Sequence, residues 1–165
     1  MFRFIYERFL FRIGEGRRPV RVSTRVEYGL IALTDIVIHS EEGSSVSAPE
    51  IAQRQKISHK YLEHILLLLR QAGFITAQKG LRGGYTLACS PEAITLSDVL
   101  NALDMNILAE MDPKDEAGGL RPVVNECFWE KINQSLNQYA SGLTLKEFAE
   151  QCKNWSKDQW DLYVI

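Results

Sequence analysis

Few residues of this chain could do covalent chemistry, and their spacing does not suit a catalytic or metal site. The three cysteines lie too far apart to predict a disulfide framework or a metal-binding spacing. The sequence contains no serine–histidine–aspartate set, paired-carboxylate motif, phosphate-binding loop or zinc spacing, and each of the three histidines has a simpler interpretation. These six residues are Cys89, Cys127, Cys152, His39, His59 and His64. We therefore do not expect an enzyme.

Two weaker possibilities for chemistry lie in the C-terminal half. Cys127 would serve as a redox or nitrosation sensor only if its thiolate were stabilised, and the acidic neighbours Glu126 and Glu130 oppose that. We expect a packing cysteine instead. An acidic cluster could gather a hard cation, although a solvated acidic loop is the simpler interpretation, and we predict no metal site. The cluster comprises Glu110, Asp112, Asp115 and Glu116.

The chemistry that the residue types do favour is recognition of a nucleic-acid groove. Residues Ser47 to Glu50 form a capping box. The serine side chain accepts a hydrogen bond from the backbone amide of Glu50, and the glutamate side chain accepts one from the backbone amide of Ser47. Pro49 lies in the first turn, where its missing donor costs nothing. A short helix through Gln55 follows, then a tight turn at Lys56–Ile57, and Ser58 caps a second helix. This pattern indicates a helix-turn-helix.

The second helix has one apolar face and one polar, partly basic face. Gly73 can end it in left-handed geometry. Two short β-like runs, 74–78 and 85–88, then flank a basic glycine-rich loop at 79–84. A helix beside a basic hairpin is what groove and backbone contacts to DNA require. The apolar face is built by Leu62, Ile65, Leu66 and Leu69, at helical spacing.

The candidate DNA contacts lie on this helix, on the hairpin and at one earlier position. Lysine can bind guanine, glutamate can accept from cytosine, and hydroxyls suit phosphate. Tyr61 is equally a packing residue, and Arg25 is either a phosphate contact or a solvated arginine. The full set is Arg25, Ser58, His59, Lys60, Tyr61, Glu63, His64, Lys79 and Arg82.

Length and composition suit a small domain with an oligomerisation element, at 165 residues and 45% hydrophobic. No apolar run approaches the ~20 residues that span a bilayer, and the cysteine usage fits a reducing cytosol. The net charge of −2 is the sum of a basic N-terminal half and an acidic C-terminal half. Residues 1–87 carry 13 Lys and Arg against 8 Asp and Glu, whereas residues 88–165 carry 6 against 13. The basic charge therefore lies with the helix-turn-helix, and we expect no membrane partner.

Helical patterns also surround this unit. A capping box at Thr24–Glu27 opens a helix before it, and one at Thr95–Asp98 starts a helix through about Leu103. A long helix from about Val123 to Tyr139 follows an irregular loop, and Thr144–Glu147 caps a short last helix. The predicted divisions are an N-terminal extension 1–21, a DNA-binding domain 22–103, a loop 104–121, a dimerisation helix with a capping helix 122–150, and a tail 151–165.

The long helix carries an apolar stripe that has too few partners in its own chain. We expect a twofold homodimer, which would also match a palindromic operator, and the alternative is that the stripe packs back on its own core. The predicted fold is mainly α with a small β wing, a winged helix-turn-helix plus a long dimerisation helix. The stripe comprises Phe128, Trp129, Ile132, Leu136 and Tyr139.

A set of short motifs spread over residues 22–150 follows a known family pattern. The motifs are Ser23-Thr-Arg25, Tyr28-Gly-Leu30, Ile51-Ala52, Ile57-Ser58, Tyr61-Leu-Glu63, Leu69-Arg70, Ala72-Gly73, Gly83-Gly-Tyr85, Ile94-Thr95 and Asp98-Val99, with Trp129 followed fifteen residues later by Thr144-Leu145. In these residues the chain resembles the bacterial IscR/NsrR/CymR family of winged-helix regulators. The resemblance implies a homodimer, usually a repressor, with the second helix of the motif in the major groove and the wing in the minor groove.

The chain departs from the family where many members hold an iron–sulfur cluster. The three cysteine positions of those members fall here on Met111, Ala117 and Val123, and the occasional histidine falls on Glu126. Such clusters need several thiolates, so we expect no iron–sulfur cofactor. The chain resembles instead the cluster-free branch typified by the cysteine-metabolism repressor CymR.

Two further departures concern the wing and the N-terminus. The wing has the sequence Gly80-Leu-Arg-Gly-Gly84. We expect Arg82 to enter a narrow minor groove or to contact a phosphate, and the alternative is a surface arginine without a role in DNA binding. Residues 1–19 are aromatic and basic without a signal-peptide pattern. We expect an upstream mis-assigned start, with translation from Val20; the alternative is a genuine arm that contacts DNA or a membrane surface. An intact mass of natively expressed protein that matches residues 1–165 would contradict the mis-assigned start.

These observations predict a dimeric, sequence-specific DNA-binding regulator, most simply a repressor that blocks promoter access. The alternative is a regulatory subunit whose DNA binding is controlled by docking to a metabolic enzyme, with the acidic C-terminal half as the docking surface.

Overall fold

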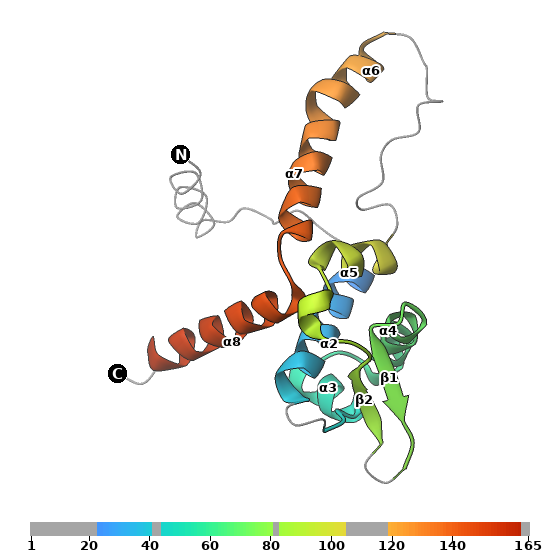
Figure 1. Ribbon diagram of the computed structural model, residues 1–165, viewed down its shortest axis with the longest axis vertical. Coiled ribbons are helices and arrows are strands. Elements are labelled where there is room, and N and C mark those ends of the chain that lie inside the picture. Colours follow the sequence, from blue (N-terminus) through green and yellow to red (C-terminus); the bar gives the residue numbers. More distant parts are fainter. Residues whose placement is uncertain (1–22, 41–43, 81–82, 105–118, 163–165) are drawn as a thin grey trace.

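The computed structural model describes residues 23–40, 44–80, 83–104 and 119–162, and Figure 1 shows their arrangement. The predicted extension at 1–21, most of the predicted loop 104–121, and Arg82 lie outside these residues. The elements are α2 (Thr24–His39), α3 (Ala48–Gln55), α4 (His59–Gln71), β1 (Ile75–Gln78), β2 (Gly84–Leu87), the short 3-10 helix η2 (Pro91–Ala93), α5 (Leu96–Leu103), α6 (Leu120–Val124), the π-helical turn η3 (Asn125–Trp129), α7 (Glu130–Ser141) and α8 (Leu145–Leu162). The prediction of a mainly helical chain with a small β wing is confirmed.

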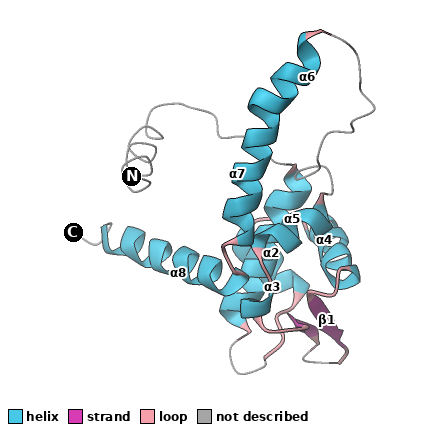
Figure 2. Ribbon diagram, turned by 45° about the horizontal axis from the view of Figure 1, so that its top comes forward, coloured by secondary structure: helices cyan, strands magenta, loops and turns pink. Residues whose placement is uncertain are grey.

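The core lies where α2, α3, α4 and α5 pack together, and α8 packs against α2 from the other side. The four leucine and isoleucine residues predicted on the inner face of α4 are all fully buried. Figure 2 shows the helices above the strands, with the small sheet at the lower edge of the molecule. The core side chains with no exposed surface include Val26, Leu33, Ile36, Ile51, Leu62, Ile65, Leu66, Leu69, Val99 and Leu145.

The wing is a two-stranded antiparallel hairpin, with Ala77 opposite Tyr85 and Gln78 opposite Gly84. Val46 adds a third partner, because its amide donates to the Tyr85 carbonyl at 2.9 Å and its carbonyl accepts from the Tyr85 amide at 2.8 Å. This approach needs a glycine at position 84, since a Cβ there would lie 2.7 Å from the carbonyl oxygen of Val46. The wing is therefore joined to the segment that leads into α3.

Most predicted helix ends are confirmed, with two corrections. The capping boxes of α3 and α5 are present, Gly73 adopts a φ of 80° after α4, and Thr144 and Glu147 form the reciprocal bonds at the start of α8. The prediction that Thr24 caps the first helix was wrong: Ser23 is the cap and accepts from the Val26 amide. Ser58 does occupy the cap position of α4, but its side chain makes no capping bond.

The C-terminal elements are longer than predicted. The segment Leu120–Ser141 runs as one rod in Figure 1 through α6, η3 and α7, and extends beyond the expected 123–139 at both ends. The last helix continues to Leu162, so the prediction of a short one was wrong. A bridge between Thr95 and Thr144 anchors the start of α8. No helix within the described ranges combines the length and hydropathy that crossing a membrane requires.

Candidate DNA interface

The polar face of α4 is open to solvent at its N-terminal end. Ser58, His59, Lys60, Glu63 and His64 are all exposed, while the opposite face is buried against α2, α3 and α5. The first turn of α4 also presents unpaired backbone amides and the positive end of the helix dipole, both of which suit a phosphate. The face therefore combines side chains of the types that can read base edges with a helix terminus suited to a phosphate.

Two side chains on this helix have partners within the protein. The Nδ1 atom of His59 lies 3.7 Å from Oε1 of Glu63, so these two side chains form an ion pair when the imidazole is protonated. The ring of Tyr61 is half-buried and meets the ring of Tyr28 edge-on, with centroids 5.7 Å apart. The packing interpretation of Tyr61 thus has a specific contact, whereas its contact with DNA stays a prediction.

The wing and the first turn of α2 contribute the remaining candidates. Lys79 is exposed next to the hairpin loop, and Arg82 falls outside the described residues. Arg25 lies 3.7 Å from a carboxylate oxygen of Asp104, the residue that ends α5, and its side chain is about half exposed. That ion pair holds Arg25 toward α5 and weakens the case for a phosphate contact.

A buried carboxylate holds the first helix of the motif, and sequence reasoning missed it. Oδ1 of Asp35 accepts from Nη2 of Arg54 at 2.6 Å, and Oδ2 accepts from Nε of Arg54 at 3.1 Å and from Nε2 of Gln55 at 2.6 Å. The hydrogen bond to Asp35 raises the pKa of Arg54, and burial opposes this. The last turn of α3 is thereby fixed to the C-terminal part of α2.

Lys56 is a second residue that the sequence placed only in a turn. It follows α3 in the left-handed region, with a φ of 54°, and its side chain is exposed. A lysine in this conformation is unusual, because the region favours glycine or asparagine. Its position between α3 and α4 places a cation beside the N-terminus of α4.

The apolar stripe predicted for dimerisation is open to solvent in the single chain. Phe128, Trp129, Ile132, Leu136 and Tyr139 are between 39% and 54% exposed. The rings of Phe128 and Trp129 meet edge-on, with centroids 4.9 Å apart. The alternative that this stripe packs back on its own core is therefore wrong for the single chain, since none of the five is buried.

Within the described residues, no group of cysteine, histidine and acidic side chains could hold a metal ion, and the acidic cluster at 110–116 lies outside those residues. Cys127 is exposed, so the prediction of a packing cysteine was wrong for the single chain. Cys89 is exposed after β2, and Cys152 is partly buried in α8, where burial raises the pKa of its thiol. Three thiols on three separate elements do not fit the ligand set of an iron–sulfur cluster within one chain.

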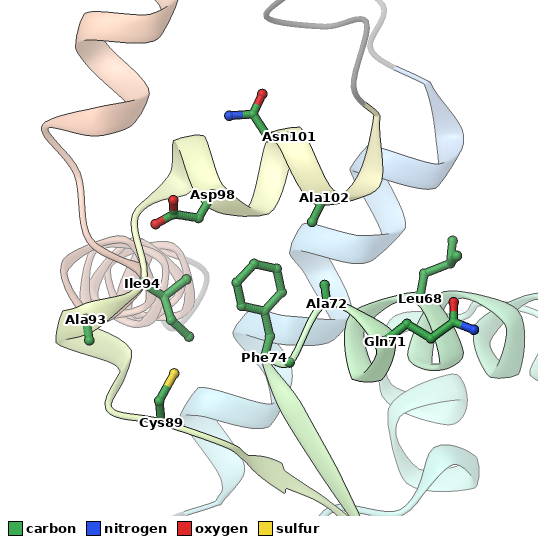
Figure 3. Close-up of a pocket in the computed structure, with 11 residues that line it drawn as sticks. Leu68, Gln71, Ala72, Phe74, Cys89, Ala93, Ile94, Asp98, Asn101 and Ala102 are labelled. Atoms are coloured by element: carbon green, nitrogen blue, oxygen red, sulfur yellow. The ribbon is translucent and has the colours of Figure 1, made fainter.

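An open groove of about 790 Å³ lies away from the polar face of α4. Figure 3 shows Phe74 at its centre, with Leu68 and Gln71 of α4 on one side and Ile94 and Cys89 on the other. It adjoins the C-terminal end of α4, whereas the candidate contacts lie at the N-terminal end. The groove is therefore separate from the DNA interface.

A helix-turn-helix followed by a hairpin wing defines the class of winged-helix DNA-binding proteins. A family model, Rrf2, described as an iron-dependent transcriptional regulator, matches residues 22–151. An HTH-type transcriptional regulator of Synechocystis sp. is 30% identical over 140 residues, which cover 85% of this chain and 95% of that protein. This chain therefore belongs to the Rrf2 family of transcriptional regulators.

Solved structures agree with this assignment. CymR of B. subtilis, described as the global cysteine regulator, has a TM-score of 0.69 and 28% identity over 81% of this chain and 98% of CymR. IscR of T. potens has a TM-score of 0.65 and 29% identity over 81% of this chain and 88% of IscR. The resemblance to this family of winged-helix regulators that was expected from the sequence is confirmed.

Proposed function

We propose that this chain is a homodimeric, sequence-specific repressor that reads a palindromic operator and carries no iron–sulfur cluster of the family type. The observation that carries the proposal is the exposed polar face of α4, beside a wing whose base is joined to the same motif through Val46. A protein bound across a promoter excludes polymerase, so repression is the simplest outcome.

The recognition helix supplies both base and backbone contacts in this proposal. Lys60 and His64 extend from the outer face of α4 toward base edges, and the first turn, with Ser58, binds a phosphate. Lys79 binds the DNA backbone beside the minor groove, and Arg82 contacts the minor groove itself. Sequence is read by α4, and the wing fixes orientation.

The apolar stripe on η3 and α7 supplies the dimer interface. Five large apolar side chains, including Trp129 and Ile132, lie exposed along one rod. A contiguous exposed patch of this kind marks an interaction surface. Pairing with a second copy about a twofold axis would bury it and place two α4 helices for two half-sites.

The proposal is tested by selecting genomic fragments with the full-length protein over a salt series, and by sedimentation of the same protein. We expect a palindromic site with half-sites one or two helical turns apart, a steep fall of affinity with salt, and a dimeric mass. Weak binding without sequence preference, or a monomeric mass at micromolar concentration, would contradict the proposal. Iron content and visible absorbance of anaerobically purified protein test the absence of the cluster.

A second candidate is control of DNA binding by a docked metabolic enzyme. The observation that favours it is α8, which extends away from the body in Figure 1 and carries Trp155 at 69% exposure. A pull-down from lysate of the native organism tests it. A stoichiometric complex with a metabolic enzyme that Trp155→Ala abolishes would support docking, and its absence would contradict it.

A further inference from the structure

One exposed side chain on the outer face of α4 is apolar. Leu67 is 40% exposed, whereas its neighbour Leu68 is half-buried and packs against the core. Among the exposed side chains of α4, every residue of which the structure describes, Leu67 is the only large apolar one. A single exposed leucine is ordinary on a protein surface, so its position on the helix decides whether it has a function.

Leu67 lies in the middle of the polar face and not at the border of the core. At 3.6 residues per turn, it is roughly 20° around the helix from Lys60 and roughly 60° from His64. Leu69, which is fully buried, points roughly 160° away from it. The leucine therefore projects from the centre of the surface that the proposed function places against DNA.

The exposed residues of this face have the spacing of a base-reading row. They lie at positions i, i+3, i+4 and i+7 of the helix, and recognition helices of the homeodomain class read the major groove with four residues at this spacing. The row spans roughly 10 Å of helix axis, the length of about three base pairs. Leu67 takes the fourth position of the row, which comprises Lys60, Glu63, His64 and Leu67.

The major groove offers one apolar target to such a side chain, the C5 methyl group of thymine. The other base edges present hydrogen-bond donors and acceptors, and a leucine would remove water from them without replacing its hydrogen bonds. A leucine at this position therefore favours thymine over cytosine, which presents an amino group and no methyl.

We propose that Leu67 is a specificity-determining residue that contacts the C5 methyl group of a thymine in each half-site of the operator. This contact rests on the proposed function, because it requires α4 to enter the major groove. Lys60 and His64 supply hydrogen bonds from the same face, and Leu67 adds the apolar contact that selects thymine.

Replacement of single thymines by uracil tests the contact at the level of one methyl group, because uracil keeps the base pairing. The duplex is one that the full-length protein has selected, and fluorescence anisotropy gives the dissociation constant for each replacement. In the parent, uracil at one position of each half-site should weaken binding by about three- to fourfold per half-site, which corresponds to one buried methyl group. In Leu67→Ala, the same replacement should have no effect.

Two further variants control for folding and for the loss of a leucine in general. Leu67→Met keeps an apolar side chain at the same position and should retain the sensitivity to uracil. Leu120→Ala truncates an exposed leucine on α6, far from α4 in Figure 1, and should also retain it. Both alanine substitutions are at exposed helical positions, and alanine is the best helix former, so the helical circular dichroism should be unchanged.

Two results would overturn the contact while leaving sequence-specific binding intact. The first is that the parent and Leu67→Ala respond equally to uracil at every thymine. The second is a monomeric mass for Leu67→Ala by light scattering, because it would place the leucine in the dimer interface. Failure of the parent to select any DNA would overturn the proposed function and this contact together, and it is recognised before any uracil is introduced.

Discussion

Arg54 and Asp35 form a two-point ion pair that joins α3 to α2, with distances of 2.6 and 3.1 Å between guanidinium and carboxylate atoms. The carboxylate is fully buried, whereas the guanidinium remains one third exposed. Gln55 donates a third hydrogen bond to the same carboxylate. Electrostatic attraction thus joins α3 to α2, in addition to the apolar packing between them.

Removal of the cation should be costly, because it leaves a buried carboxylate without its counter-charge. We expect Arg54→Ala to lower the free energy of unfolding by about 2–3 kcal/mol, less than the roughly 3–5 kcal/mol of a fully buried pair, because the Arg54 side chain is one third exposed. Urea denaturation followed by circular dichroism measures this. Arg70→Ala, an exposed arginine on α4, is the control, and equal losses of stability in the two variants would show that Asp35 is hydrated.

Acid should weaken the helix starts before it affects the core. The side-chain and backbone hydrogen bonds from Ser47 hold the pKa of Glu50 below its ordinary value of about 4.5, and those from Thr144 do the same for Glu147. Each depressed pKa gives stability that is present above about pH 4.5 and is lost as the pH falls through the folded-state value. We therefore expect the free energy of unfolding to decrease as the pH is lowered below about 5.

The Glu50→Gln variant isolates one of these contributions. An uncharged glutamine does not titrate, so the fall in stability with acid should be shallower than in the parent. Glu150→Gln, which removes a carboxylate from the exposed surface of α8, provides the control. Parallel pH profiles for the parent and Glu50→Gln would mean that this capping box makes no titrating contribution.

The wing lysine should contribute to affinity without reading sequence. We expect Lys79→Ala to weaken binding to all duplexes to a similar extent, and to reduce the slope of log affinity against log salt by about 0.9 for each phosphate that is no longer neutralised. Anisotropy titrations over a salt series measure both quantities. Lys146→Ala removes a lysine that pairs with Glu92 at 2.5 Å on the surface, and should leave the slope unchanged. A change of sequence preference in Lys79→Ala would contradict the backbone role.

The apolar stripe should determine the oligomeric state independently of folding. Ile132 is 43% exposed in the single chain, so Ile132→Asp should leave the helical circular dichroism intact and convert a dimer to a monomer. Light scattering during size exclusion measures the mass. Gln134→Asp introduces the same charge on the opposite side of α7 and should remain dimeric. A dimeric Ile132→Asp would require the interface to lie elsewhere.

Local patterns were readable from the sequence because they depend on residues three or four apart. The capping boxes at Ser47 and Thr95, the apolar face of α4 and the glycine after it all follow from such spacings. The first cap was misplaced by one residue, because Ser23 and Thr24 have equivalent hydroxyls and only backbone geometry decides between them.

Long-range relationships were not readable in the same way. Asp35 and Arg54 are 19 residues apart, and only the presence of an acid within an apolar helix hinted that it needs a buried partner. The π-helical turn at Asn125–Trp129 leaves no pattern in residue types. The length of α8 was missed because the segment beyond Gln151 lacks an apolar period, although the helix that begins at Leu145 continues through it to Leu162.

The pairing of Val46 with Tyr85 has a consequence for how the protein folds. An isolated two-stranded hairpin is only marginally stable in water, so the wing depends on this bridge to Val46. Formation of the pair closes a long loop that contains α3 and α4, and that closure becomes favourable only when both helices are in place. The wing is therefore expected to form only when α3 and α4 are in place, and to melt when they unfold.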